Sequence, residues 1–433
     1  MRWLRIAAIS LFGVACLGYG IVAGRFELFP FNQSRAVFHA LRQAVARPER
    51  VGPQLPLEQL TEEEQQQLEA LGYLPSYAPA PKQSGVVLHR PELSAGGQVL
   101  YVSSHAPEAW LVGFDGEPVH TWAHDFSSAC PEVELDSDEA WRVGFWRRAR
   151  LLPDGELLAV FDYQALLRLD AHSGLLWARC DQYHHEVSID AEGNIYALRR
   201  ERRRDPRIHE ELSFLDDWID VLGPDGTRLH SVSVAEALLD SPYASHFARV
   251  TEGWLRADGD ILHTNAIKLL DGRHAAAIPA FRAGNVLISL RYFDLAAVID
   301  FEAKRAVWAI SGMWRKPHDP TLLDNGNLLI FDNLGRSGRS QVLEIEPTTQ
   351  QIVWSYPGER SSNLLTECCG AAQRLANGNT LITVSQSGRV LEVTPAGEVA
   401  WEFVNPHQVG DQIAALWDAF VVDPLMVRSL PPQ

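Results

Sequence analysis

Short apolar runs separated by glycine-containing turns make up most of this chain. The stretch MWRKPHDPTLLDNGNLLIF, Met313 to Phe331, contains a histidine, a short apolar run, the turn dipeptide Asn325-Gly326 and a second apolar run. Runs of this length bounded by glycine, asparagine and aspartate predict β-strands rather than helices. Variants of this stretch recur from Val86 to about Pro406, which indicates an array of similar β-units.

Six such units fit between residues 86 and 406. Each unit contains strands separated by turns, and its closing strand usually carries a tryptophan; these are Trp122, Trp177, Trp308, Trp354 and Trp401, the third unit having none. Short, evenly spaced strands with glycine turns favour radial repetition, which leaves few exposed sheet edges. The predicted fold is therefore a six-bladed β-propeller, and residues 407–433 either close the ring or pack beneath it.

The first 85 residues follow a different pattern. Arg2 and Arg5 precede an apolar run from Ile6 to Gly24, long enough to cross a bilayer as a helix. We expect residues 1–25 to be an uncleaved transmembrane anchor with a cytoplasmic N-terminus, which places the propeller on the periplasmic or extracellular side. A cleaved signal peptide is the alternative.

Residues 26–85 are predicted to form a stalk between the anchor and the propeller. A capping box at Thr61 to Glu64 starts a short helix that should end near Gly72. The proline- and alanine-rich segment 75–81 is expected to be an extended linker.

Composition narrows the classes of partner. Thirteen tryptophans and 46% hydrophobic residues supply a large core, while the formal net charge is −17. Nucleic acids and anionic membrane surfaces require clustered Lys and Arg, so neither is expected as a partner.

Four cysteines lie outside the apolar N-terminal run. Cys130 and Cys180 are a plausible disulfide pair if the chain is exported. Cys368 and Cys369 are adjacent and could join only in a strained ring, so we expect thiols or separate partners there. The spacing of the cysteines does not suggest structural zinc.

The turn glycines align the repeats and single out one position. The residue eight before the turn glycine is Arg147, His185, His318 and Gly370 in four units, counted from Gly155, Gly193, Gly326 and Gly378. In another unit His263 lies nine before Gly272, and in the first unit the same count reaches His89 with an uncertain register. If this position begins the innermost strand, His185, His263 and His318 converge at one mouth of the central channel.

A single histidine at such a position usually bonds within a turn, but three in successive units favour a functional cluster. Asn265 lies two residues after His263 and projects to the same side of a strand, and Arg291 ends the next strand with a planar cation suited to oxyanions. Three histidines can also bind a metal, but no supporting carboxylates are evident. Neutral imidazoles, an amide and a guanidinium suit an anionic ester whose leaving group needs a proton.

The segments HTNAI, LISLR and PHDPTLLDNGNLLIFDN, followed by AAQRLANGNTLITVSQSGRVLEVTPAGEVAWEFVNP, resemble the arylsulfate sulfotransferase family of exported bacterial propeller enzymes. The resemblance covers about residues 180–406. It implies transfer of a sulfuryl group from a phenolic sulfate donor to a phenol acceptor by a two-step mechanism, with no cofactor and no nucleotide sulfate donor. No phosphate-binding glycine-rich loop is found in the sequence, which agrees with this implication.

The resemblance also implies a role for each candidate residue. His318 corresponds to the nucleophile that is transiently sulfated, and His263 with Asn265 corresponds to a pair that holds the sulfuryl oxygens and assists the leaving phenolate. Arg291 would clamp the developing charge. His185 would protonate or orient the phenolic oxygen, with His184 as the alternate. Pro317 departs from the family pattern, which bears on acceptor preference.

Two other functions fit parts of the sequence. A non-catalytic, membrane-tethered propeller could use the same core as a binding scaffold, because fold alone does not determine function. A quinone-dependent dehydrogenase is suggested by DAHSGLLW, which resembles the tryptophan-docking turns of such enzymes. That class usually has more blades and a calcium site with clustered carboxylates, which makes it the weaker alternative.

Overall fold

The computed structural model describes residues 76–135, 140–335, 339–357, 364, 366–428 and 430–431. The chain divides into two units, Met1–Gly52 and Pro53–Gln433, and every described residue belongs to the second. The predicted anchor and the predicted helix at Thr61 lie outside the described residues and stay predictions. Within the described ranges, no helix combines the length and apolar character needed to span a bilayer.

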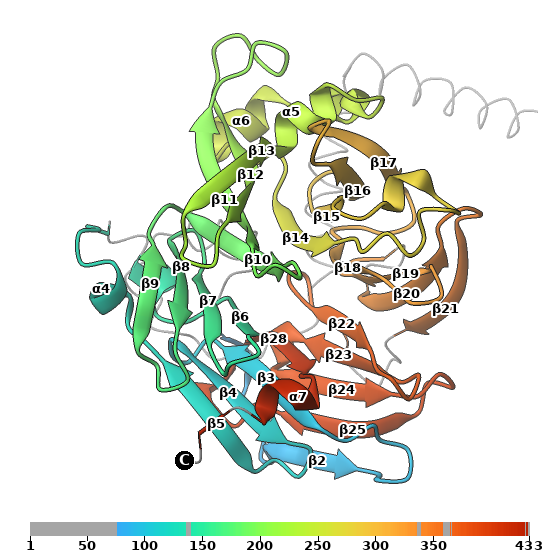
Figure 1. Cartoon of the computed structure of the whole chain (residues 1–433). Helices are drawn as coiled ribbons and strands as arrows, with labels where there is room; N and C mark the ends of the chain where they lie inside the picture. The colour runs from blue at the N-terminus through green and yellow to red at the C-terminus, as the bar shows by residue number, and fades with distance from the viewer. Residues whose placement is uncertain are drawn as a thin grey trace, which may run out of the picture. The chain divides into compact units, whose positions relative to one another are not determined.

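Antiparallel sheets form nearly all of the described structure (Figure 1). From the innermost strand outwards, the first of six sheets in the described ranges contains β28 (Leu416–Val421), β3 (Gln98–Ser103), β4 (Glu108–Gly113) and β5 (Pro118–Ala123), and the second contains β6 (Arg148–Leu151), β7 (Leu157–Phe161), β8 (Ala165–Leu169) and β9 (Leu175–Arg179). The third contains β10 (Tyr183–Ile189), β11 (Ile195–Arg203), β12 (Phe214–Leu222) and β13 (Arg228–Ser233), and the fourth contains β14 (Thr264–Leu269), β15 (Val286–Leu290), β16 (Leu295–Asp300) and β17 (Arg305–Ser311). The fifth contains β18 (His318–Leu322), β19 (Leu328–Asp332), β20 (Gln341–Glu346) and β21 (Gln351–Pro357), and the sixth contains β22 (Ala371–Arg374), β23 (Thr380–Val384), β24 (Arg389–Val393), β25 (Val399–Val404) and β2 (Gly85–His89).

Smaller elements connect these sheets. A three-stranded sheet contains β1 (Ser76–Pro79), β27 (Gln412–Ala414) and β26 (Gln408–Val409). The short helices are α4 (Phe126–Ala129), η2 (Ala140–Val143), α5 (Val234–Leu239), η3 (Ala244–Arg249), α6 (Glu252–Ala257), η4 (Pro279–Phe281), η5 (Ser385–Ser387) and α7 (Pro424–Val427).

The innermost strands contact one another in a closed cycle. β28 contacts β6, β6 contacts β10, and the cycle continues through β14, β18 and β22 back to β28. Four-stranded antiparallel sheets that meet along their first strands are the blades of a β-propeller. The described part of the chain is therefore an all-β, propeller-type structure.

The C-terminal segment supplies the strand that completes the cycle. β28 pairs antiparallel with β3, with Leu416 opposite Ser103 and Val421 opposite Val99. Strands from the two ends of the propeller region thus share one sheet. Of the two placements predicted for residues 407–433, closing the ring is the one observed.

Two N-terminal segments differ from expectation. β2 pairs with β25 as the fifth, outermost strand of its sheet, so His89 lies at an outer edge and not at the centre. The glycine count failed there because the innermost strand of that unit comes from the C-terminus. Ser76–Pro79 is extended as predicted, but it pairs with β27 and is not a free linker.

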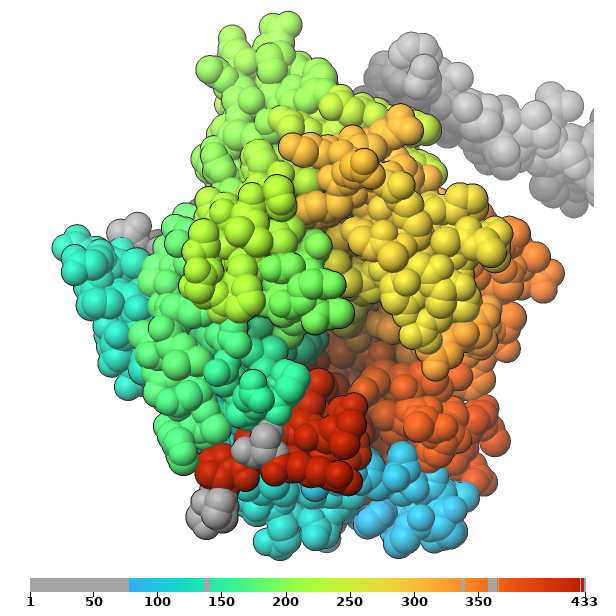
Figure 2. Space-filling view, in the orientation of Figure 1, coloured from blue at the N-terminus to red at the C-terminus, as the bar shows by residue number. Residues whose placement is uncertain are grey.

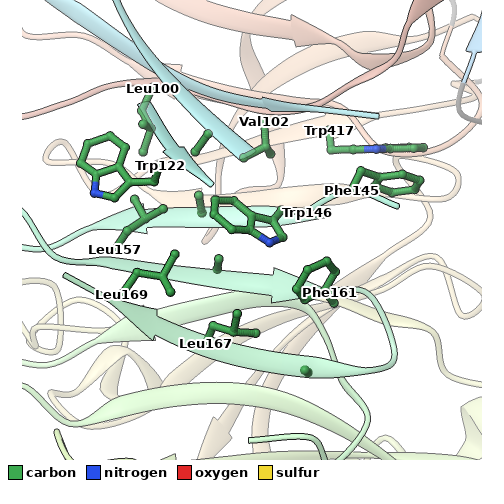
Figure 3. Packing of buried hydrophobic residues seen from close by; sticks show 14 of the residues in the cluster. Leu100, Val102, Trp122, Phe145, Trp146, Leu157, Phe161, Leu167, Leu169 and Trp417 are labelled. Atoms are coloured by element: carbon green, nitrogen blue, oxygen red, sulfur yellow. The ribbon is translucent and has the colours of Figure 1, made fainter. Parts of the chain in front are cut away.

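Apolar residues on facing sheets form the core between them. Figure 3 shows Trp122 and Leu100 on the sheet of β3–β5 facing Leu157 and Leu167 of the next sheet, with Trp146 between them. Successive side chains of a strand point to opposite faces of its sheet. Trp122, Leu100, Leu157 and Leu167 therefore fill this layer, while their neighbours along each strand face the other side of the sheet. Each inter-sheet layer is thus a separate hydrophobic cluster.

Four of the repeated tryptophans link a sheet to the next one within the described residues. The indole N–H groups donate to backbone carbonyls in neighbouring turns: Trp122 to Gly155, Trp177 to Pro224, Trp354 to Pro395 and Trp401 to Phe114. An indole N–H that is removed from water usually finds such a partner. The repeat seen in the sequence is therefore a repeated inter-blade tie, and Trp401 makes the tie across the ring closure.

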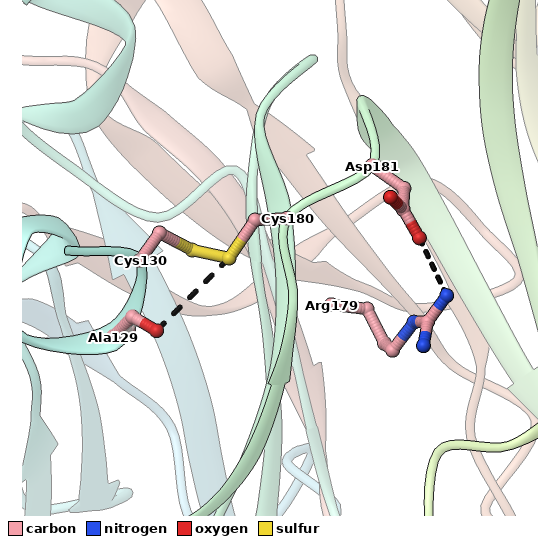
Figure 4. The surroundings of a disulfide bond; sticks show 5 residues. All are labelled: Ala129, Cys130, Arg179, Cys180 and Asp181. Carbon is pink, nitrogen blue, oxygen red and sulfur yellow. Dashed lines mark hydrogen bonds and ion pairs between the residues drawn. A yellow bond between two sulfur atoms is a disulfide. The ribbon is translucent and has the colours of Figure 1, made fainter. Parts of the chain in front are cut away.

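The disulfide expected between Cys130 and Cys180 is present. It joins the segment after α4 to the end of β9 (Figure 4). Nearby, Arg179 forms an ion pair with Asp181 at 2.6 Å. The disulfide therefore holds β9, the outermost strand of its sheet, to the connection between β5 and β6.

We predict that Trp401→Ala lowers the free energy of unfolding by about 3 to 5 kcal/mol, because it removes a fully buried indole and the tie at ring closure. Denaturant unfolding of the purified protein, followed by far-UV circular dichroism, measures the change. Trp177→Ala is the matched control and should lose less, because Trp177 is only partly buried. Equal losses in the two variants would contradict the role given to Trp401.

Candidate active site

Four of the five candidate residues lie near the beginning of an innermost strand, and Arg291 lies at the end of the second strand of a sheet. His318 is the first residue of β18, His263 immediately precedes β14, and His185 is the third residue of β10. Arg291 directly follows β15, and Asn265 is the second residue of β14. All five side chains are buried. Because the inner strands form a cycle, their first residues share the centre of the ring.

Unusual backbone conformations mark this level of the ring. His185, His263 and Cys369 have φ values of 53°, 50° and 67°. The pairing of β10, β14 and β18 with their neighbours is also irregular near these first residues. A non-glycine residue in the left-handed region costs about 1 to 2 kcal/mol. Such strain persists only where the surrounding structure enforces it, and strained residues are often concentrated at functional sites.

The hydrogen bonds of His318 identify its tautomer. Nδ1 lies 2.6 Å from Asn333 Oδ1 and 3.1 Å from the Lys316 carbonyl, both acceptors. Asn333 cannot be reversed, because its amide nitrogen donates to the carbonyls of Thr366 and Cys369. Nδ1 therefore carries the hydrogen. Nε2 keeps its lone pair and accepts from the Cys369 backbone N–H at 3.2 Å.

His263 is paired with a carboxylate. Its Nδ1 lies 2.5 Å from Asp260 Oδ2, and its backbone N–H donates to Asp260 Oδ1. Arg200 donates to the same Oδ2 at 3.1 Å. Asp260 thus fixes the ring orientation and directs Nε2 of His263 away from itself. This is the arrangement by which a carboxylate supports a histidine in proton transfer.

His184, the alternate to His185, lies against it, and both side chains are buried. Their Nδ1 atoms are 2.9 Å apart. His185 Nδ1 lies 3.5 Å from Asp162, and His184 Nε2 lies 3.3 Å from Asp217. The His185 and His263 rings meet edge to face at 5.1 Å. Two adjacent histidines can share this space because His185 has a positive φ.

Asn265 and Arg291 occupy different positions around His318. The Asn265 amide donates to the Pro317 carbonyl at 2.8 Å and accepts from Ser289, so it holds the backbone that precedes His318. Arg291 is buried beside Tyr292, and its backbone N–H donates to the His263 carbonyl. The guanidinium is close enough to help lower the pKa of His318.

Four further residues complete the cluster. Arg147 donates to Cys369 Sγ at 3.3 Å and lies over the Trp417 ring; Cys369, Asp260 and Asn333 make the contacts described above. The glycine count reaches Arg147 directly and reaches Gly370, next to Cys369. Asn333 ends the segment PHDPTLLDNGNLLIFDN that carries the resemblance, but no sequence pattern assigned it a role, and Asp260 lies three residues before His263, outside the glycine count.

Burial and neighbouring cations keep the histidines neutral. Burial lowers the pKa of His318 and His185 well below the usual range, and Arg291 and Arg147 respectively add to this. Burial also lowers the pKa of His263, although Asp260 opposes the shift. Each ring therefore offers an unprotonated nitrogen at neutral pH, which is what a nucleophile or a general base requires.

His185, His263 and His318 do not form one group of metal ligands in the described part of the chain. Within the described ranges, the groups whose ligand atoms lie close enough for an ion are Asp162 with His184 and His185, and His105 with Glu108 and His407. Neither includes His263 or His318. The cluster around His318 and His263 contains imidazoles, the guanidinium groups of Arg147 and Arg291, the Asp260 carboxylate, the Asn333 amide and Cys369.

A layer of ion pairs lies further along the same inner strands. Arg148 and Arg150 pair with Glu186 and Asp418, and Lys268 bridges Glu186 and Asp319 at 3.4 and 2.8 Å. These three cations and three carboxylates come from β6, β10, β14, β18 and β28. Side-chain ion pairs thus connect five of the inner strands near the histidines.

A cavity of about 710 Å³ opens beyond this layer. Arg150, Lys268, Asp319 and Phe420 line it, and none of the five candidate residues does. Figure 2 shows a hollow near the middle of the face in view, bordered by yellow, orange and red segments like those that line the cavity. The ion-pair layer therefore lies between this cavity and His318.

Comparisons with known proteins give one family and a set of distant structural likenesses. A model of the arylsulfotransferase (ASST) family matches residues 149–406. No curated protein matches the sequence. A Bacteroides caccae protein of unknown function shares 13% identity at a TM-score of 0.49, covering 74% of this chain and 98% of that one.

Two other solved structures are similarly distant. A streptogramin B lyase has 11% identity and a TM-score of 0.42 over 78% of this chain and 86% of its own. The WD40 β-propeller domain of Doa1 has 9% identity and a TM-score of 0.42 over 76% and 85%. Likenesses this weak carry no argument about function, whereas the family match covers more than half of the sequence. The chain belongs to the arylsulfotransferase family.

Proposed function

We propose that this protein transfers a sulfuryl group from a phenolic sulfate ester to a phenol, with His318 as the nucleophile, on a six-bladed propeller. The observation that carries the proposal is the state of His318: a buried, neutral imidazole whose hydrogen is held on Nδ1 by Asn333. Membership of the arylsulfotransferase family supports the reaction class. The closed cycle of inner strands supports the blade number.

In the first step, His318 Nε2 attacks the sulfur of the donor, the S–O bond to the aryl group breaks, and the phenolate leaves. The Cys369 backbone N–H, which donates to Nε2 before the donor binds, is placed to donate instead to a sulfuryl oxygen as the N–S bond forms. The guanidinium groups of Arg147 and Arg291 offset the negative charge on the transferred group. Fixed donors and cations of this kind stabilise a charged transition state without reorganisation.

In the second step, the oxygen of the acceptor phenol attacks the sulfur of sulfated His318, and the S–N bond breaks to restore the imidazole. His263 Nε2 takes the proton that the acceptor phenol releases, and Asp260 stabilises the imidazolium that forms. Splitting the transfer into two steps allows donor and acceptor to use one site in turn. No nucleotide sulfate donor takes part, and the predicted N-terminal anchor would place the reaction outside the cytoplasm.

His318→Ala should lose acceptor-dependent release of phenol from a chromogenic aryl sulfate by at least about 10³-fold, because the covalent route is removed. Peptide mass analysis of the native protein with donor alone should find one added sulfuryl group on the peptide that contains His318. His172→Ala, an exposed histidine, is the control. Unchanged turnover in His318→Ala would refute the nucleophile assignment. Absence of turnover in both the native protein and His318→Ala would refute sulfuryl transfer and favour a non-catalytic binding propeller.

Asn333→Ala should lower kcat by about 10²- to 10⁴-fold with little change in donor KM, because Nδ1 loses the acceptor that fixes the tautomer. Steady-state kinetics over a range of donor concentrations separate the two parameters. Asn325→Ala, in an outer turn, is the matched control because its amide bonds to Glu344 away from the site. A change confined to KM would contradict the positioning role.

Asp260→Asn should reduce the rate and move the acid limb of its pH profile to lower pH. Asp260 opposes the lowering of the His263 pKa, so removing its charge lowers that pKa further. His263 then stays neutral, and competent as a base, down to a lower pH. The pH dependence of kcat/KM tests this, with the exposed Asp271→Asn as control. An acid limb that moves upwards or does not move would exclude His263 as the base.

A further inference from the structure

Two adjacent cysteines lie against the nucleophilic face of His318. Cys368 and Cys369 are both buried, and their sulfur atoms are 2.9 Å apart and share a hydrogen bond. Arg147 donates to Cys369 Sγ at 3.3 Å. Nothing in the proposed sulfuryl transfer uses either sulfur.

The backbone of Cys369 is connected to both nitrogens of the His318 ring. Its N–H donates to Nε2 at 3.2 Å. Its carbonyl accepts from the Asn333 amide at 2.7 Å, and the oxygen of that amide accepts from Nδ1. A displacement of the 368–369 peptide therefore changes the surroundings of both nitrogens.

The two sulfurs differ in acidity. Burial opposes ionisation of both, but the hydrogen bond from Cys368 and the charge of Arg147 bring the pKa of Cys369 below its usual value. Burial and the neighbouring sulfur raise the pKa of Cys368. One thiolate beside one thiol is the combination that thiol–disulfide exchange requires.

We propose that Cys368 and Cys369 form a covalent modification site for small disulfides, and that its oxidation changes the reactivity of His318. The Cys369 thiolate attacks the disulfide R–S–S–R, forming a mixed disulfide and releasing one thiolate. The Cys368 thiol then attacks the Cys369 sulfur, the second RSH leaves, and a Cys368–Cys369 disulfide forms. Two electrons pass from the protein dithiol to the small disulfide, which leaves as two thiols.

Closing this bond requires the backbone to move. The trans peptide fixes neighbouring Cα atoms about 3.8 Å apart, closer than the about 4.4 to 6.8 Å usual across a disulfide. The ring can therefore close only by rotation about the bonds that flank the 368–369 peptide and by twisting of that peptide. The peptide that must adjust is the one whose N–H lies on His318 Nε2. Oxidation also prevents the Cys369 sulfur, to which Arg147 donates, from ionising.

The consequence for catalysis rests on the proposed sulfuryl transfer. The Cys369 N–H is placed to donate a hydrogen bond to a sulfuryl oxygen of the transferred group. Because oxidation displaces this N–H, it should lower the transfer rate by about 10²-fold, as loss of a single such donor does in other enzymes. Reduction should restore the rate. The dithiol form is then the active form.

The test treats the full-length protein with cystamine and reads three quantities. Peptide mass mapping should find Cys368 linked to Cys369. The rate at which diethyl pyrocarbonate modifies His318 should differ between the reduced and oxidised proteins, and the transfer rate should fall on oxidation. Cys368→Ser should stop at a mixed disulfide on Cys369, and a Cys130→Ser, Cys180→Ser variant should respond as the native protein does.

Each outcome decides one claim. Failure of cystamine to modify either cysteine in the folded protein, when both react after unfolding, would overturn the site. Linkage without any change in His318 modification would overturn its coupling to His318. Linkage with changed His318 modification, in a protein that never transfers a sulfuryl group, would support the modification site while refuting the proposed function.

Discussion

The closed contact of the six innermost strands is the constraint on which the rest of the described structure depends. A propeller sheet places its first strand at the centre of the ring, so the contacts of that strand with the other innermost strands are complete only when the ring closes. Closure requires β28, from the C-terminus, to pair with β3 near the start of the described chain. The buried centre around His318 exists because both ends of the propeller are held in one sheet.

The centre is polar, and burial makes each polar group there depend on its partners. An unpaired buried charge or hydrogen-bonding group is costly. The structure meets this demand with interlocking pairs, such as Asp260 with Arg200 and His263. The same pairs fix ring orientation and tautomer. Stability and preorganisation of the candidate site therefore have a common physical origin.

The channel is organised in layers along the inner strands. The first residues of these strands provide imidazoles, guanidinium groups and the dithiol; the next residues provide the ion pairs of Arg148, Arg150 and Lys268 with their carboxylates. The cavity of about 710 Å³ follows. A cross-linked ion-pair layer is a rigid boundary, because moving one of its members exposes several charges at once. It separates the chemistry of the His318 level from the space lined by Phe420.

The repeat in the sequence was sufficient to predict the all-β propeller, the recurring tryptophans and the common position of His185, His263 and His318. Those features depend on local periodicity, since apolar alternation and turn glycines act within a few residues. The pairing of Cys130 with Cys180 was also predictable from composition and context. The family followed from motifs that lie within the matched residues 149–406.

Only the tertiary structure decided which groups stand beside those histidines. Asp260 reaches His263 from three residues before it, and Asn333 reaches His318 from the end of the paired strand β19. Cys369 reaches His318 from the next sheet with a positive φ, and the repeat encodes none of these contacts. The displaced first strand of the ring is the clearest case: the local pattern pointed to His89, but chain closure gave the central place to β28. Local sequence specifies strands and turns; the packing of the closed ring specifies which side chains meet.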